Sequence, residues 1–266
     1  MKKSFVILSI LIITFILTAF GYYNIGETSP IPIKFEKKEK VFLKNDFRKA
    51  VMEDIDPDFY LKVGSRFNTV ISKNELHHAK SIIDILPKKA TQNKANFNSV
   101  SIGILEKDNE LVKYGNNEQL SSDQLSLLKT AEYSTNFYVI SYCNNLLDNG
   151  AIENDKISYY MTVVPEKEAE FHKGSKGLLD YLKREIKTKL KDYSKNKLRP
   201  GKLTFTIAKD SSIKFIEVNS SSGYTKLDNT FIELISNTKD LWSIAANARG
   251  EKVDQEFVLF YGKMGC

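Results

Sequence analysis

Residues 220–223 are three consecutive serines and a glycine, the densest group of nucleophile-type side chains in this 266-residue chain. A serine nucleophile needs a general base within hydrogen-bond reach, and that base needs an orienting group. The motif G-x-S-x-G is absent, and an S-x-x-K match at Ser194 lacks its partner motifs. The pattern therefore favours a structural role, in which hydroxyls satisfy a turn and Gly223 supplies a permissive φ between a strand and a helix.

The other residues capable of chemistry do not complete a site. His77 and His78 are adjacent on a predicted helix and form no H-E-x-x-H motif, and His172 lies in a charged turn. Cys143 and Cys266 are too far apart in sequence for a metal motif, and both a disulfide and two separate thiols remain open. One glycine without a GK[ST] context is a weak phosphate signal. The sequence thus predicts no catalytic residue, no metal and no cofactor, and the protein is predicted not to be an enzyme.

The N-terminus has the pattern of a membrane segment. Lys2 and Lys3 precede an apolar run from Phe5 to Phe20. The lysines indicate that the rest of the chain faces outward. We favour a retained anchor over residues 1–23, with a signal peptide cut near residues 19–21 as the alternative, because the run is intermediate in length between the two.

The elements that must position the remaining residues follow from periodicity. Residues 24–45 form a Pro-containing charged linker, and 46–160 an α+β region without an assigned family. Within it the patterns predict a helix from 44 to 55, a helix from 72 to 87 with a Ser72–Glu75 capping box, strands over 99–115, a helix from 121, and strands over 136–143 and 157–165.

Apolar periodicity also predicts the elements in the last third of the chain. The patterns predict a helix over 174–190, a hairpin over 201–218 with a bulge between Phe215 and Ile216, a helix capped by Thr225 and Asp228, and a final strand from Gln255. The hairpin, helix and final strand have the order strand–strand–helix–strand, and residues 98–143 show a similar order. We favour a common small α+β solution over a degenerate repeat.

Residues 201–262 resemble the C-terminal domain of TonB-like energy transducers, and residues 163–186 resemble the segment that precedes it. The match is carried by residues in the family's order, namely Glu170, Phe171, Gly174, Gly201, Val218, Ser221, Ser222, Gly223, Leu227, Asp228, Trp242 and Gly250. The resemblance implies an α+β domain over 161–266, attached to a membrane helix and a mixed middle region. It also implies a protein partner. Nucleic acid is not predicted as a partner, because the chain has no arginine cluster with interleaved aromatic residues.

A crossover to the last strand predicts the sheet order two-one-three, which makes that strand an edge. An edge strand can accept an extended peptide, as the resembled family does with a segment of an outer-membrane receptor. The predicted partner-binding residues are Lys252, Gln255, Glu256, Phe257, Val258, Leu259, Phe260 and Tyr261. Because both faces of this strand are apolar, a position inside a sheet is the other interpretation. Trp242 is either a partner anchor or, as we favour, a core residue.

Three functions follow from these observations. The first is a membrane-anchored periplasmic protein that binds protein partners by strand addition, with receptor segments or inner-membrane motor proteins as partners and energy transduction to outer-membrane transport as its role. The second is a structural or assembly protein of the cell envelope that uses the module for packing or as a homodimer. The third is an exported enzyme with carboxylates at 53–58, a run that is more typical of a solvated helix end. The predicted location is the inner membrane, or the periplasm if the N-terminal segment is cleaved.

Overall fold

The computed structural model describes residues 59–106, 110–187, 189–192 and 197–263, all of which belong to one compact unit spanning Ala50–Cys266. The described part is a mixed α+β fold with several sheets and six α-helices. None of these helices is long and apolar enough to cross a membrane. The predicted anchor, the linker, the helix over 44–55 and the acidic run at 53–58 lie outside the described residues, as does Cys266.

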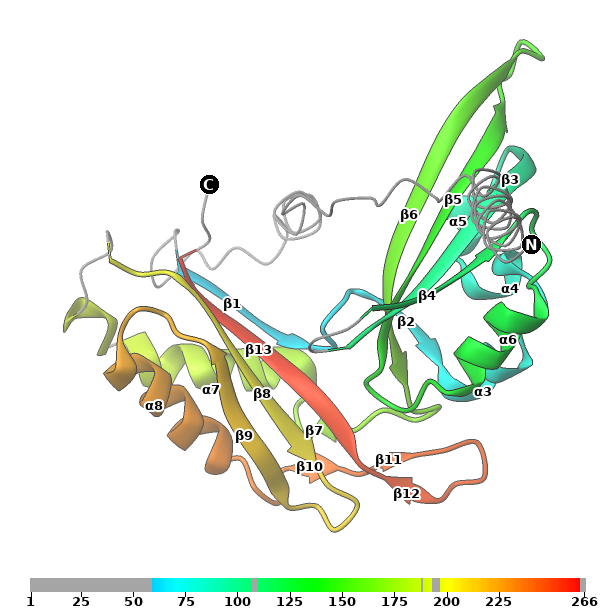
Figure 1. The fold of residues 1–266 in the computed structure, drawn as a ribbon. Coiled ribbons are helices and arrows are strands. Elements are labelled where there is room, and N and C mark those ends of the chain that lie inside the picture. Colours follow the sequence, from blue (N-terminus) through cyan, green and yellow to red (C-terminus); the bar gives the residue numbers. More distant parts are fainter. Residues whose placement is uncertain (1–58, 107–109, 188, 193–196, 264–266) are drawn as a thin grey trace, which may run out of the picture. The chain divides into compact units, whose positions relative to one another are not determined.

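A five-stranded sheet forms the first half of the described chain (Figure 1). Its order is β2-β6-β5-β3-β4, in which β2 is parallel to β6 and the other pairs are antiparallel. The strands are β2 (Thr69–Ser72), β3 (Lys94–Leu105), β4 (Glu110–Gly115), β5 (Asn136–Leu146) and β6 (Ile152–Val164). Apolar side chains alternate toward one face, where Ile102, Phe137 and Val163 are fully buried. That face is covered by α3 (Lys73–His78), α4 (Ile82–Ile85), α5 (Lys88–Thr91) and α6 (Ser122–Lys129).

The predicted helix over 72–87 is wrong in one respect, because it is two short helices. The capping box at Ser72 is present and starts α3. The chain then turns extended at Ala79 and Ser81. There the Ile82 amide donates to the Glu118 carbonyl at 2.9 Å, and the Lys80 carbonyl accepts from Leu120. A tertiary contact thus replaces helical hydrogen bonds, and a second capping box at Ser81 restarts the helix as α4.

A four-stranded antiparallel sheet forms the C-terminal half together with one strand from the start of the described chain. Its order is β1-β13-β8-β9. The strands are β1 (Phe59–Gly64), β8 (Pro200–Ile207), β9 (Ile213–Ser220) and β13 (Gln255–Lys263). Helices α7 (Gly174–Lys187) and α8 (Thr225–Ser236) pack on one face (Figure 1), and a 3₁₀ turn, η2, spans Lys189–Asp192. The predicted order two-one-three is confirmed for β9, β8 and β13.

The hairpin of this sheet contains the predicted bulge. The pairing of β8 with β9 shifts between Thr204 and Thr206, where Phe215 has a φ of 53°. This conformation points the Phe215 ring outward, and it is 77% exposed. The slip in apolar phase was therefore a sound indication of an extra residue in the edge strand.

Two small sheets connect α8 to the last strand. The strand β10 (Trp242–Ser243) pairs with β7 (Glu170–Phe171), and β11 (Ala245–Ala246) pairs with β12 (Lys252–Val253). Trp242 is 8% exposed and belongs to the C-terminal core, which confirms its prediction as a core residue.

The two large sheets share one arrangement. In the first, β4-β3-β5 with α6 has the same strand–strand–helix–strand order as β9-β8-β13 with α8. In both, the third strand has a further neighbour on its outer side, which is β6 for β5 and β1 for β13.

Candidate functional site

The terminal strand β13 is hydrogen-bonded on both sides. It pairs with β8 from Gln255 to Gly262, and it pairs with β1 from Val258 to Lys263. The prediction that this strand is an open edge is therefore wrong, and the alternative of a position inside the sheet is correct. The cause is a segment from far upstream that occupies the place predicted for a guest peptide.

Most side chains predicted to bind a partner are committed to the interior. Leu259 and Tyr261 are buried in the C-terminal core, and Val258 is 2% exposed. Phe257 stacks on Phe205 with centroids 5.7 Å apart. Among the remaining predicted residues, Phe260 is half-buried beneath Lys62.

The polar residues at the start of the strand are also engaged. Gln255 is 2% exposed, accepts from the Ala169 amide at 2.7 Å and donates to Glu168 at 2.7 Å. The Glu256 amide donates to the Ser134 hydroxyl. Of the predicted set, only Lys252 presents an exposed side chain to a concave surface.

The sequence patterns do not predict the strand β1. Phe59 and Leu61 are 4% and 1% exposed, and both belong to the C-terminal core, against which Val63 also packs. The Lys62 ammonium lies over the Phe260 ring, 6.0 Å from its centroid. The alternation Phe59, Leu61, Val63 was a period-two signal, but it is only six residues long and directly follows an acidic run.

The serines form the seam between β9 and α8. The Asp228 carboxylate accepts from the Ser221 hydroxyl at 2.5 Å, from the Ser222 amide at 3.0 Å and from the Tyr261 hydroxyl at 2.8 Å. Gly223 has a φ of 89°, which confirms the permissive position. The predicted cap is wrong, because the N-cap is Tyr224 and makes no side-chain bond to the helix. Asp228 instead ties the turn to the last strand.

The electrostatics of this network are those of a structural anchor. Burial raises the pKa of Asp228, but the hydrogen bonds from Ser221, Ser222 and Tyr261 outweigh burial, so the net pKa lies below the ordinary value. Burial and the bond to Asp228 raise the pKa of the Tyr261 phenol. Among the described residues, the hydroxyls of Ser221 and Ser222 hydrogen-bond to Asp228 and to backbone groups of the turn and not to a histidine.

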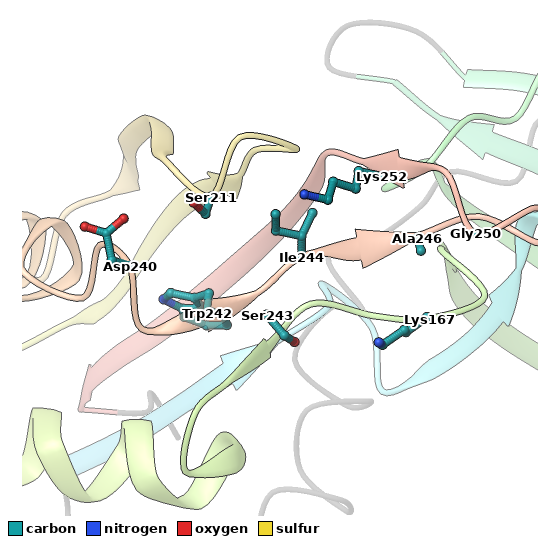
Figure 2. A pocket seen from close by; sticks show the side chains of 9 residues that line it. All are labelled: Lys167, Ser211, Asp240, Trp242, Ser243, Ile244, Ala246, Gly250 and Lys252. Atoms are coloured by element: carbon teal, nitrogen blue, oxygen red, sulfur yellow. The ribbon is translucent and has the colours of Figure 1, made fainter.

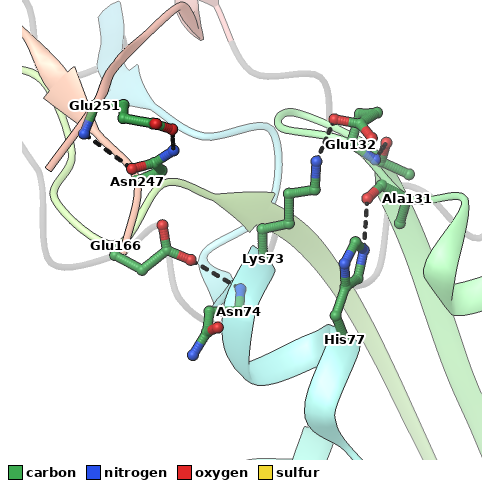
Figure 3. Close-up of polar contacts among 9 residues, drawn as sticks. Lys73, Asn74, His77, Ala131, Glu132, Glu166, Asn247 and Glu251 are labelled. Carbon is green, nitrogen blue, oxygen red and sulfur yellow. Dashed lines mark hydrogen bonds and ion pairs between the residues drawn. The ribbon is translucent and has the colours of Figure 1, made fainter. Parts of the chain in front are cut away.

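The histidines lie elsewhere, with His77 and His78 in α3 and His172 directly after β7, where its amide donates to the Leu241 carbonyl. His77 contacts the Ala131 carbonyl at 3.1 Å, and His78 contacts the Asn74 carbonyl at 2.7 Å. Figure 3 shows the surrounding contacts, in which the Asn74 amide donates to Glu166 and Lys73 pairs with Glu132. Within the described ranges, no group of three or more His, Cys, Asp or Glu side chains is placed to hold a metal.

A groove lies beside β10 (Figure 2). Its volume is about 470 Å³, and it lies between the β8–β9 turn, the segment after α8 and β12. Trp242, Ile244 and Ala246 form its apolar wall, and Lys167 and Lys252 its basic end.

Comparison of the chain with protein-family models, curated protein sequences and solved structures finds no match. The interpretation of the site therefore depends on its residues. They provide strand pairing on both sides of β13, an anchored turn at Asp228 and a groove beside Trp242.

Proposed function

We propose that this chain is a membrane-anchored periplasmic protein without catalytic activity that serves as a structural or assembly protein of the cell envelope. In this proposal the TonB-like C-terminal unit uses its strand-accepting edge for internal packing. The observation that carries it is the antiparallel pairing of β1 with β13.

The energetics favour a permanent role for β1. Complete burial of a Leu or Phe side chain stabilises by about 1.5–3 kcal/mol, so Phe59 and Leu61 together contribute about 3–6 kcal/mol. This sum is a large part of the total stability of a typical domain, which is about 5–15 kcal/mol. A guest peptide would have to offset that loss before it gained any affinity.

A second candidate is partner binding by strand exchange, as in energy transduction, with outer-membrane receptor segments or inner-membrane motor proteins as partners. It is favoured by the end of β1. Six of the nine residues of β13 pair with β1, which stops at Gly64 opposite Val258. A small cavity of about 30 Å³ lies there, lined by Gly64, Phe257 and Trp242 among others. A longer guest strand with a larger side chain at this point would cover more of β13 than β1 does.

The experiment that separates the two uses the full chain in lipid nanodiscs and a photo-crosslinkable peptide with the sequence of residues 57–66. A matched peptide carries aspartate in place of Leu61. Under the assembly proposal neither peptide crosslinks to β13, and the β13 amides exchange hydrogen as slowly as those of β8. Crosslinking of the native peptide alone, together with fast exchange in β13, would overturn the proposal and support strand exchange.

A further inference from the structure

We propose that the groove beside Trp242 binds an extended segment of a protein partner, in which an acidic side chain stands next to apolar ones. This inference goes beyond the proposed function, because it concerns a surface separate from the β1–β13 pairing and holds whether or not β1 can be displaced.

The apolar wall of the groove is supported by side chains of the C-terminal core. The Trp242 indole donates to the Thr238 hydroxyl at 3.1 Å and packs edge-on against Phe171 at 5.6 Å. It is also tilted against Phe257 at 5.1 Å. Because Trp242 is only 8% exposed, it backs the wall rigidly, and the contacts to a partner fall mainly to the half-buried Ile244 and Ala246.

The backbone along the wall is equally fixed. The strand β10 pairs with β7, and Ala246 exchanges two backbone hydrogen bonds with Lys167 at 2.8 and 3.0 Å. Ile244 therefore projects from a segment that is held on both sides of it, and in Figure 2 its side chain lies between Trp242 and Lys252. The wall can accept a partner without rearrangement.

The charges of the groove define the partner. Lys167 and Lys252 are both exposed, and neither has an ion-pair partner among the described residues. Both lie on the side of the groove away from Asp240, which follows α8 (Figure 2). Two ammonium groups beside an apolar wall complement a carboxylate flanked by apolar side chains.

The same charges argue against other ligands. A polyanion such as nucleic acid needs a run of cations, whereas here the carboxylate of Asp240 lies within the groove. A volume of about 470 Å³ is in the range of binding pockets. These features suit a short extended segment, of which a few side chains would fill the groove.

The chain offers its own reporter for a test, because Trp242 is its only tryptophan. The full chain in nanodiscs is titrated with five-residue peptides in which glutamate alternates with leucine, valine or phenylalanine, and Trp242 emission is followed. The matched peptides carry glutamine in place of glutamate. We expect a saturable emission change with the glutamate peptides, weaker at high salt, and a lower affinity for the glutamine peptides.

The lysines provide the decisive variants. Lys167→Gln and Lys252→Gln should each weaken binding up to about fivefold, as exposed ion pairs do, and the double variant up to about 25-fold. The control is the double variant Lys173→Gln with Lys176→Gln, which changes the net charge equally outside the groove and should leave binding unchanged. The inference is overturned if no peptide binds below about 1 mM, if the glutamine peptides bind equally well, or if the control weakens binding as much.

Discussion

The strength with which β1 is held can be tested by Leu61→Ala. Leu61 is 1% exposed, pairs with Tyr261 across the sheet and belongs to the C-terminal core. Removing three carbons from a buried leucine loses the transfer free energy and leaves a cavity, and such changes cost about 2–5 kcal/mol. We expect a loss near the middle of this range, about 3 kcal/mol, because β1 lies at one side of the sheet and its neighbours can relax in part.

The assay is urea unfolding of the full chain in nanodiscs, followed by the emission of Trp242, which reports on the C-terminal core. Leu241→Ala is the control, since Leu241 lies next to Trp242 but is 39% exposed. Its free energy of unfolding should change by less than about 0.5 kcal/mol. If Leu61→Ala has as small an effect as Leu241→Ala in the Trp242 transition, β1 is a loosely held occupant, and the assignment of the strand to internal packing is refuted.

Three further predictions concern Asp228, the turn glycine Gly223 and the core of the five-stranded sheet. Asp228→Asn removes an acceptor of charge-assisted hydrogen bonds and should lower the free energy of unfolding by about 1.5–3 kcal/mol at neutral pH. Because the folded pKa of Asp228 lies below the unfolded value of about 3.9, its contribution is complete above that value and is lost as the pH falls through the folded pKa. Asp228→Asn should therefore flatten the stability profile below about pH 4, and an unchanged acid slope would contradict the network. Gly223→Ala should lower the free energy of unfolding by more than about 1 kcal/mol in the same urea assay, because the φ of Gly223 is 89° and the added Cβ would stand 2.8 Å from the Lys197 carbonyl oxygen. The control is Gly64→Ala, which should be neutral or slightly stabilising because the added Cβ would have no atom within 4 Å. Cys143 is buried, and burial raises the pKa of its thiol. In a Cys266→Ser background, a thiol reagent at pH 8 should therefore label Cys143 only when urea unfolds the five-stranded sheet. Rapid labelling of the folded chain would show that this core is open.

Local patterns predicted the elements whose signals lie within a few residues. The capping boxes at Ser72 and Ser121 start α3 and α6, and the phase slip at Phe215 marks the bulge in β9. In each case the partners are three or four residues apart or in a single hairpin, so their interactions are encoded in adjacent letters of the sequence.

The features that were missed depend on contacts between distant segments. Helix 72–87 is interrupted because residues 118–120 take its hydrogen bonds. Asp228 was expected to cap α8, but its carboxylate bonds to Tyr261, 33 residues away. The strand β1 pairs with residues about 200 positions later, and no local pattern specifies such a partner.

The candidate site was therefore predictable in part. The order of β9, β8 and β13 followed from crossover rules. What the sequence could not supply was the occupancy of the outer side of β13, since an edge predicted from one module is open only if no other part of the chain reaches it.

The shared arrangement of the two sheets explains why β13 has a resident neighbour. In the first sheet the third strand, β5, is closed by β6, which follows it directly in the chain. In the four-stranded sheet the strand that closes β13 comes from upstream, as β1. Among the described residues, the edges that remain on the four-stranded sheet are β1, which is only six residues long, and β9, which is bulged and carries Lys214. Short, bulged and charged strands are poor templates for strand addition. Since neither remaining edge suits strand addition, the partner site that we propose uses side chains, in the groove where Lys167 and Lys252 lie beside an apolar wall.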